Sequence, residues 1–455
     1  MILNDKNKIK IADEKQIVGM CHGCFDVLHI GHIAHLKEAK NHCDVLIVSV
    51  TADEYINKGP NRPYYNQDTR MEMLDELECV DYVILSDAAT PFQLIEIIKP
   101  NLYFKGNEYQ QVENDLTGNI GVDIELVERN GGKVCFTTGR TDSSTRIINN
   151  VLNNSETGVK EYMQKLHDKY SLEYVMKQID NLKNIKAVVI GEWINDVYVE
   201  VEPTGLMHKD PAVSSIYKGK VEHDGGAVII ANHIREFCKC DLITQGNPIV
   251  KKRYISHVGG RNRPVKLFGV NEYPKEVKIN LPDLTGYDLT VVADFGHGFI
   301  DGNRRVQIDE MSGYIALMCQ TNSDNYGKNA ITKWEKCNMF AIDKREVDVT
   351  NHGINSIGSI MRVSIMFNTE GANGATVRTR NEMHKLPALT KDVIDTTGCG
   401  DAFFAMASIC SFADIEPDIT LLLASISATL HSKVLGNERC VKKSDVLQCL
   451  KGMWL

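Results

Sequence analysis

Long apolar runs, a surplus of positive charge and repeated or low-complexity segments are all missing from the sequence. No apolar run among its 455 residues approaches the roughly 18 that a membrane-spanning helix needs. The first residues are polar and lack the apolar core of a signal peptide. The net charge of -9 argues against a surface that binds nucleic acid, although a local basic pocket for phosphates is compatible with it. We therefore expect a cytoplasmic globular protein whose partners are neither membranes nor nucleic acid.

A disulfide framework and a complete zinc site are also missing. The chain has 13 cysteines, and without an export segment we expect them to be reduced thiols. Cys21 and Cys24 form a CxxC pair, and Cys238 and Cys240 form a CxC pair. A zinc site needs a second ligand pair at suitable spacing, and no such pair is evident. The cysteines therefore predict neither a metal centre nor a redox centre.

The length and composition predict more than one folded core. A chain of 455 residues is long enough for two or three domains of about 150 residues each. Its 43% hydrophobic content is that of an ordinary globular protein. We place a first domain at 1–152, a helical linker at 153–183 and a second domain at 184–455. The linker is predicted because its apolar residues recur at helical spacing.

The first domain alternates apolar runs with helical segments. We predict strands at 17–20, 45–50, 82–85 and 102–104, and helices at 69–77 and 91–98. Such alternation is typical of a parallel sheet with helices on both faces, which makes this a doubly wound α/β domain. In such folds, ligands bind beyond the carboxyl ends of the strands.

The segment His29-Ile30-Gly31-His32 lies where the first strand passes into a helix. The start of a helix offers free N–H groups and the positive end of its dipole, so it favours an anion. Two imidazoles three residues apart can face the same phosphate, and Gly31 allows the backbone to approach a ligand closely. This arrangement suits displacement at a nucleotide α-phosphate, where charge accumulates on the phosphoryl oxygens.

These residues resemble the HxGH signature of the nucleotidyltransferase superfamily, and most closely its cytidylyltransferase-like branch. That branch has a Rossmann-like fold and transfers a nucleotidyl group to a phosphorylated small molecule. The resemblance implies that His29 and His32 are catalytic and that Asp26 contacts the substrate. It implies nucleotide or phosphate binding by residues of the first turn, of a basic loop, of the fourth strand's end and of a hydroxyl-rich helix start: Gly23, Phe25, Lys58, Arg62, Lys105, Ser143, Ser144 and Thr145.

A second chemical centre lies near the end of the chain, in the stretch that reads DTTGCGD. Gly398, Cys399 and Gly400 would present backbone N–H groups at a helix start, which forms a pocket for developing phosphate charge. Asp401 would lie at that pocket and could accept a proton from a substrate hydroxyl.

This stretch resembles the DTxGxGD signature of the ribokinase/PfkB family of carbohydrate kinases. The resemblance implies a ribokinase-like fold with Asp401 as the base and Gly398–Gly400 around the transferred phosphoryl group. It implies that Asp343 and Glu346 order Mg²⁺ indirectly, although the family has Asn where Asp343 stands. It implies nucleotide contacts by Thr369, Gly371 and Gly374, and sugar contacts by Asp196, Gly225 and Gly226.

The bifunctional heptose kinase/adenylyltransferases of lipopolysaccharide precursor synthesis combine both resemblances. Two departures stand out in this chain. The kinase-like domain comes last rather than first, and the double glycine is followed by the apolar run 227–230 instead of a polar helix start. Glu192 also replaces a common Asp. We therefore expect a sugar pocket that differs from the standard heptose pocket.

The two resemblances imply a bifunctional sugar-activating enzyme. The second domain would phosphorylate a sugar or sugar phosphate with ATP and Mg²⁺. The first would transfer a nucleotidyl group from ATP or CTP to a sugar phosphate and release pyrophosphate, for surface glycan synthesis. The active form is expected to be a homo-oligomer, such as a dimer. Two alternatives stay open: the kinase-like domain is a silent binding or dimerisation module, or the chain is a cytidylyltransferase for an alcohol phosphate such as glycerol phosphate.

Overall fold

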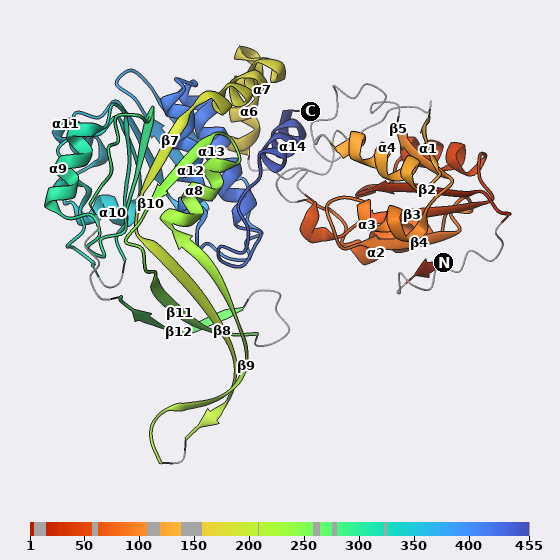
Figure 1. Cartoon of the computed structure of the whole chain (residues 1–455), viewed down its shortest axis with the longest axis horizontal. Coiled ribbons are helices and arrows are strands. Elements are labelled where there is room, and N and C mark those ends of the chain that lie inside the picture. Colours follow the sequence, from red (N-terminus) through yellow and green to blue (C-terminus); the bar gives the residue numbers. More distant parts are fainter. Residues whose placement is uncertain are drawn as a thin grey trace. The chain divides into compact units, whose positions relative to one another are not determined.

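The computed structural model describes residues 1–3, 15–56, 62–106, 119–137, 157–207, 209–257, 264–274, 280–322 and 325–454. The chain divides into two compact units (Figure 1), Met1–Asn154 with Leu447–Leu455, and Ser155–Val446. The candidate residues Lys58, Ser143, Ser144 and Thr145 lie outside the described residues. None of the described helices combines the length and apolar character that crossing a bilayer requires.

The first unit contains a six-stranded sheet in which every pairing is parallel. Its strand order is β1-β4-β3-β2-β5-β6. The strands are β1 (Ile2–Leu3), β2 (Val18–Gly23), β3 (Val45–Thr51), β4 (Tyr82–Ser86), β5 (Leu102–Gly106) and β6 (Lys133–Thr137). The helices are α1 (Ile30–Lys40), α2 (Gln67–Asp75), α3 (Phe92–Ile98) and α4 (Asn119–Arg129). The four predicted strands and the parallel α/β architecture are confirmed.

Two apolar clusters cover the two faces of this sheet, which is why strands β2 to β5 read as continuous apolar runs. Strands β1, β6 and helix α4 escaped prediction, since β1 has two residues and β6 is a partly exposed edge strand. The chain passes from β2 to β3 on one side and later returns to β5 on the other. Ligands in such sheets bind in the crevice at this reversal, which places the turn after β2 at the expected position.

The second unit is built on an eight-stranded sheet of order β10-β7-β13-β14-β15-β16-β17-β18. The pairings from β10 to β16 are parallel, and those of β17 and β18 are antiparallel. The strands are β7 (Lys186–Gly191), β10 (Lys239–Ile243), β13 (Leu289–Asp294), β14 (Ile315–Cys319), β15 (Met339–Asp343), β16 (Ile365–Thr369), β17 (Ala375–Arg378) and β18 (Met383–Leu386). The predicted α/β architecture of this unit is therefore confirmed.

Helices accompany this sheet along its whole length. They are α6 (Thr157–Lys169), α7 (Leu172–Asn181), α8 (Ala227–Arg235), α9 (Gly302–Met311), α10 (Lys344–Val349), α11 (Ile354–Ile360), α12 (Cys399–Phe412) and α13 (Pro417–His431). Helix α14 (Lys443–Trp454) begins at the end of this unit, and its residues from Leu447 on are grouped with the first unit. Helix α12 is buried on nearly every face, since its sequence after the glycines consists of small and apolar residues. The first turn of α12 is therefore held in place by a well-packed helix.

Helices α6 and α7 lie in the segment that we expected to link the domains, and they are grouped with the second unit. The Tyr162 hydroxyl donates a hydrogen bond to the carbonyl of Asp418 over 2.7 Å. Lys169 pairs with the Asp418 carboxylate at 2.9 Å. These contacts fasten α6 to the start of α13.

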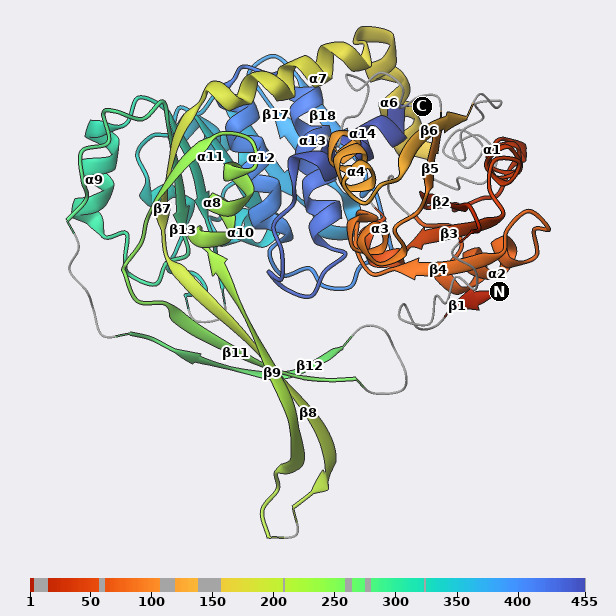
Figure 2. The same cartoon turned by 45° about the vertical axis from the view of Figure 1, so that its right-hand side comes forward.

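A second sheet of four strands projects from this unit (Figures 1 and 2), and we call it the lid sheet. Its order is β12-β11-β8-β9, with β8 (Trp193–Leu206), β9 (Val213–Gly226), β11 (Ile249–Ser256) and β12 (Val265–Glu272). Strands β8 and β9 have 14 residues each and form a long antiparallel hairpin. The sequence patterns did not predict the lid sheet, whose two pairs of consecutive strands are joined by the long-range pairing of β8 with β11.

Candidate functional sites

The two histidines of the first unit lie together at the start of α1. His29 is the N-cap residue, with extended backbone, and its Nδ1 accepts a hydrogen bond from the N–H of Gly31 at 3.1 Å. In a neutral ring this bond requires the proton on Nε2, which becomes a donor. The His29 and His32 rings stack with centroids 3.9 Å apart and planes 25° apart. The structure therefore brings the two predicted catalytic side chains together at an anion-receiving helix start.

Phe25 and Asp26 belong to the turn that delivers these histidines. Phe25 has a left-handed backbone with φ of 48°, and its ring meets that of His32 edge-on at 5.2 Å. The buried Asp26 carboxylate pairs with Arg62 at 2.8 Å and accepts the N–H of Tyr64 at 2.7 Å. Asp26 and Arg62 thus bind each other, which fixes the turn against the loop that follows β3.

Arg70 also holds the turn that follows β2 in place. Its side chain is fully buried and donates to the carbonyl of Cys24 at 2.5 Å and to that of Thr51 at 2.8 Å. It also pairs with Asp53 at 2.6 Å. The turn after β2 is therefore tied to the end of β3 by one buried guanidinium, a role that the sequence did not reveal.

Gly23 and Lys105 lie at the carboxyl ends of the two central strands. Gly23 ends β2, and an added Cβ would meet the Phe25 ring at 3.2 Å. Lys105 lies near the end of β5 and pairs with the buried Asp123 of α4 at 2.9 Å. Both residues flank the crevice at the strand-order reversal, as their predicted roles require.

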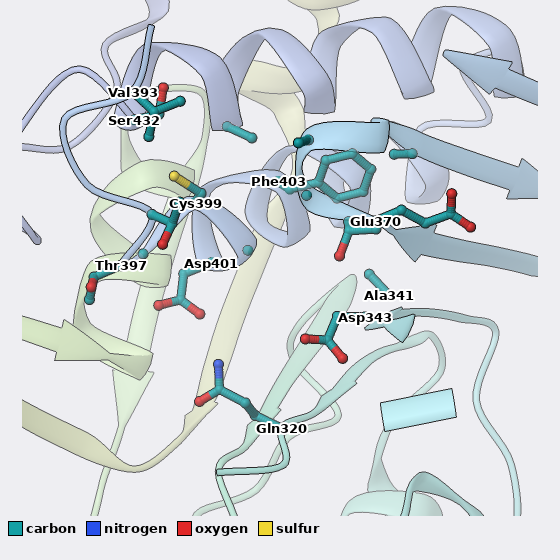
Figure 3. Close-up of a pocket in the computed structure, with 18 of the residues that line it drawn as sticks. Gln320, Ala341, Asp343, Glu370, Val393, Thr397, Cys399, Asp401, Phe403 and Ser432 are labelled. Atoms are coloured by element: carbon teal, nitrogen blue, oxygen red, sulfur yellow. The ribbon is translucent and has the colours of Figure 1, made fainter. Parts of the chain in front are cut away.

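The second unit contains a cavity of about 1150 Å³. The first turn of α12, the ends of β14, β15 and β16, and strands β8 and β11 of the lid sheet contribute to its lining. Figure 3 shows Asp401, Asp343 and Gln320 facing the same hollow space from different elements. The cavity therefore lies between the rigid sheet and the lid sheet.

Gly398 is the N-cap residue of α12 and has a left-handed backbone with φ of 81°. A Cβ there would lie 2.2 Å from Oδ1 of Asn437 and 2.4 Å from Nε2 of His431, so only glycine fits. Gly398, Cys399 and Gly400 line the cavity at a helix start, where N–H groups lack partners within the helix. The Cys399 N–H donates to the Thr396 carbonyl at 3.3 Å. Burial raises the pKa of the Cys399 thiol to about 12, so its presence there does not indicate a reactive thiol.

Asp401 opens the same helix and lines the cavity. Burial, together with the nearby charge of Asp196, raises the pKa of its carboxyl to about 7, and Lys251 opposes this shift. Its Oδ1 is buried and has no hydrogen-bond partner among the residues that the structure describes. A buried carboxylate with an unsatisfied oxygen and a pKa near neutrality has the properties of a general base.

Of the residues predicted to bind the sugar, Asp196 and Gly226 line this cavity, and Gly225 lies next to the Asp196 side chain. Asp196, on β8, pairs with Arg253 of β11 and accepts a hydrogen bond from Nδ2 of Asn437 at 3.0 Å. A Cβ on Gly225 would lie 2.7 Å from Oδ2 of Asp196, and one on Gly226 would meet the Glu192 carbonyl at 2.4 Å. The double glycine is thus required by the close approach of β9 and α8 to the site.

Asp343 and Glu346 form a reciprocal capping box at the start of α10. The Glu346 N–H donates to Oδ1 of Asp343 at 2.8 Å, and the Asp343 N–H donates to Oε2 of Glu346 at 2.7 Å. An Asp caps a helix as well as the family's Asn does, so the departure preserves the local structure. Burial, then the Asp343 charge, raises the pKa of Glu346 to about 8.

The residues predicted to face the nucleotide continue along the same cavity wall. Thr369 ends β16, and Gly371 and Gly374 lie in the short turn before β17. All three line the cavity, and both glycines have left-handed backbones. A magnesium ion held mostly by substrate phosphates needs only one or two carboxylates. Asp343, on the cavity wall, fits that need, although the described residues contain no group of three or more metal-ligating side chains.

Four residues of the second site were missed by sequence reasoning. Lys251 and Arg253 come from a lid strand, Gln320 follows β14, and Asn437 lies in the loop after α13. None belongs to a recognisable motif, and each reaches the cavity only through long-range pairing. The alternation of Lys251 and Arg253 on β11 was the one available signal, since alternate residues face the same side of a strand.

Comparison with known proteins bears on the two units differently. Residues 20–150 match the cytidylyltransferase-like family. The bifunctional protein HldE of Aliarcobacter butzleri is 40% identical over 139 residues, which are 30% of this chain and 29% of that protein. HldE of Geobacter metallireducens is 39% identical over 146 residues, 31% of this chain and 28% of that protein. The alignments thus span less than a third of the length of these relatives.

Among solved structures, the nucleoside kinase of Methanocaldococcus jannaschii, an archaeal member of the ribokinase family, is similar to 59% of this chain. The match covers 98% of that kinase at 14% identity, with a TM-score of 0.44. In this chain, the GCGD helix start, the mainly parallel sheet and the lid sheet meet at one cavity. Residues 20–150 are thus similar to the cytidylyltransferase-like family, and they are followed by a second α/β unit that carries the DTTGCGD stretch.

Proposed function

We propose that this chain is a bifunctional enzyme that activates a sugar by phosphorylation and by nucleotidyl transfer. The observation that carries the proposal is the pair of separate anion-receiving helix starts, each with its own reactive side chains. At α1 these are His29 and His32, with ring centroids 3.9 Å apart. At α12 it is Asp401, whose buried Oδ1 accepts no hydrogen bond within the described part of the chain.

In the proposed phosphorylation, a sugar hydroxyl oxygen attacks the γ-phosphorus of ATP and the bond to ADP breaks. Asp401 takes the hydroxyl proton, and the N–H groups of Gly398–Gly400 stabilise the charge that develops on the phosphoryl oxygens. Asp196 orients the sugar beside Gly225 and Gly226. A Mg²⁺ ion near Asp343 would neutralise charge on the nucleotide phosphates when bound.

In the proposed nucleotidyl transfer, an oxygen of a sugar phosphate attacks the α-phosphorus of ATP or CTP, and the bond to pyrophosphate breaks. His29 and His32 donate hydrogen bonds to the oxygens around that phosphorus. Gly23 allows the nucleotide to approach β2, and Lys105 attracts its phosphates. By resemblance, Lys58 and Ser143–Thr145 also bind the phosphates.

We further propose that the enzyme is a cytoplasmic homodimer and that its product serves surface glycan synthesis.

Two observations favour the alternative that the kinase-like domain is a silent module. The Asp196 carboxylate is already engaged by Arg253 and Asn437, so a sugar must compete with protein partners for it. The apolar helix start at 227–230 also offers a sugar no side-chain hydrogen bonds.

The deciding experiment incubates the full chain with a panel of sugars and sugar phosphates, each with ATP alone and with CTP alone, and records product masses. We expect a mass gain of one phosphate with ATP, and a nucleotide-sugar with pyrophosphate release from one of the two nucleotides. Phosphorylation that is absent across the whole panel would favour the silent module. Nucleotidyl transfer to glycerol phosphate but to no sugar phosphate would favour the alcohol-phosphate reading.

A further inference from the structure

The side chain of Lys266 extends from the lid sheet to the segment where α12 begins. We call this segment, residues 395–401, the catalytic turn. Lys266 lies near the start of β12, the edge strand of the lid sheet. Its Nζ donates to Oδ1 of Asp395 at 2.8 Å and to the Thr397 hydroxyl at 2.8 Å. Asp395 and Thr397 come directly before Gly398, the N-cap of α12. The lysine thus contacts the catalytic turn without lining the cavity.

The Asp395 carboxylate joins more elements than this one strand. Its side chain is 4% exposed, and Oδ2 accepts hydrogen bonds from the Tyr198 hydroxyl at 3.1 Å and from the Gly436 N–H at 3.2 Å. Oδ1 also accepts the Thr397 N–H at 3.2 Å. Tyr198 lies on β8. One buried carboxylate therefore ties two lid strands to the turn that must hold phosphate charge.

The charge balance at this carboxylate depends on Lys266. Burial alone would raise the pKa of Asp395, but the Lys266 hydrogen bond and charge hold that pKa below its usual range. The Lys266 side chain is 40% exposed, so the ion pair joins a buried anion to a cation that water can reach. Such a pair can separate when the lid sheet moves, and its loss leaves a buried charge without its cation.

We propose that Lys266 is a positioning residue that couples the lid sheet to the catalytic turn. While the lid sheet keeps this contact, Lys266 holds Asp395 and Thr397, and the start of α12 stays in position to face the transferred phosphoryl group. When β12 withdraws, the turn loses that support. The catalytic consequence rests on the proposed phosphorylation, whereas the coupling of lid and turn is a property of the folded chain.

A neighbouring ion pair provides the matched control. Lys252 of β11 pairs with Glu272 of β12 at 2.5 Å, within the lid sheet and away from the turn. Exposed pairs of this kind contribute little to stability. Lys252→Met therefore removes a lid lysine without touching Asp395, while Lys266→Met removes the contact itself. Lys266→Arg keeps a cation and tests rescue.

The experiment measures two quantities on the full chain. The first is backbone hydrogen exchange over 395–401, which requires no substrate. We expect Lys266→Met to accelerate it at least about 10-fold, with Lys252→Met unchanged and Lys266→Arg intermediate. The second is phosphorylation kinetics, where we expect Lys266→Met to lower kcat about 10-fold or more with KM within about twofold, because a misplaced turn weakens the transition state.

The outcomes separate the two proposals. Unchanged exchange over 395–401 in Lys266→Met, or equal acceleration in Lys252→Met, overturns the coupling. If the wild-type protein phosphorylates nothing, the kinase proposal fails and the exchange measurement alone decides the coupling. If exchange accelerates while kcat stays at the wild-type value, the positioning role is wrong, because a looser turn would then catalyse equally well.

Discussion

Helix α1 begins with two stacked imidazoles, whereas helix α12 begins with two glycines, a half-buried thiol and a carboxylate. Both starts favour an anion through free N–H groups and the helix dipole. They differ in what the proposed nucleophile needs. A sugar phosphate already carries its negative charge, so α1 needs only donors, while a neutral sugar hydroxyl must lose a proton, so α12 needs a base.

The two turns also differ in how they are held. The turn before α1 is locked by the buried guanidinium of Arg70, which donates to the carbonyls of Cys24 and Thr51. The turn before α12 is held by the Asp395 carboxylate, which accepts hydrogen bonds from Tyr198 and Lys266 of the lid sheet. A rigid lock suits a site on one compact sheet. A link to a projecting sheet suits a site that must open and close.

The largest expected effect comes from Asp401→Asn. The amide keeps the size of the side chain but cannot accept a proton, so phosphorylation should fall roughly 10²- to 10⁴-fold. Nucleotidyl transfer from a supplied sugar phosphate should continue at the wild-type rate. Asp414→Asn, an exposed position just past the other end of α12, is the control and should leave both rates unchanged. Phosphorylation at the wild-type rate in Asp401→Asn would disprove its role as the base.

The reciprocal test replaces the imidazoles. His29→Ala and His32→Ala should each lower nucleotidyl transfer about 10²-fold, because each removes one donor to the developing charge. Phosphorylation should not change. His42→Ala, just past the far end of the same helix, controls for loss of any histidine. The rate of pyrophosphate release is the measurement, and normal release from the double variant would contradict the assignment.

Replacing the two glycines at the start of α12 with alanine should change the free energy of unfolding in opposite directions. Gly398→Ala forces a Cβ against Asn437 at a left-handed φ, so unfolding of the second unit should become easier by about 1–3 kcal/mol. A Cβ on Gly400 meets no atom within 4 Å, and alanine favours helix by up to about 1 kcal/mol. Denaturant titration of both variants checks this, and equal losses of stability would refute the steric argument.

The smallest expected effect concerns pH. Because the Asp401 pKa is raised to about 7, its proton-accepting form is lost as the pH falls through that value. The kcat/KM for phosphorylation should therefore fall roughly tenfold per unit below the pKa and level off above it. Nucleotidyl transfer does not use Asp401 and should lack this limb. Such a decrease would show within a span of roughly pH 5 to 8. If kcat/KM for phosphorylation is constant over that span, another group takes the proton.

Much of the fold was readable from local pattern. Strands β2 to β5 are buried on both faces, so each appears as an apolar run between helical segments, and the sheet follows. The edge strand β6 and the lid sheet were not readable, because a partly exposed strand has weak periodicity and the lid sheet buries only a small apolar cluster on β8 and β11. Arg62 illustrates the limit at a site. Its motif indicated phosphate binding, and the structure pairs it with Asp26.

The sequence by itself determined where the two candidate sites lie along the chain. HxGH and GCGD mark helix starts because glycine, imidazole and carboxylate act over a few residues, within reach of local backbone geometry. Only the tertiary structure decided which distant residues complete each site. Asn437 reaches Asp196, and Lys266 reaches Asp395, across pairings that no local pattern encodes. The physical reason is that strand register and burial are properties of the packed core, while a motif is a property of adjacent residues.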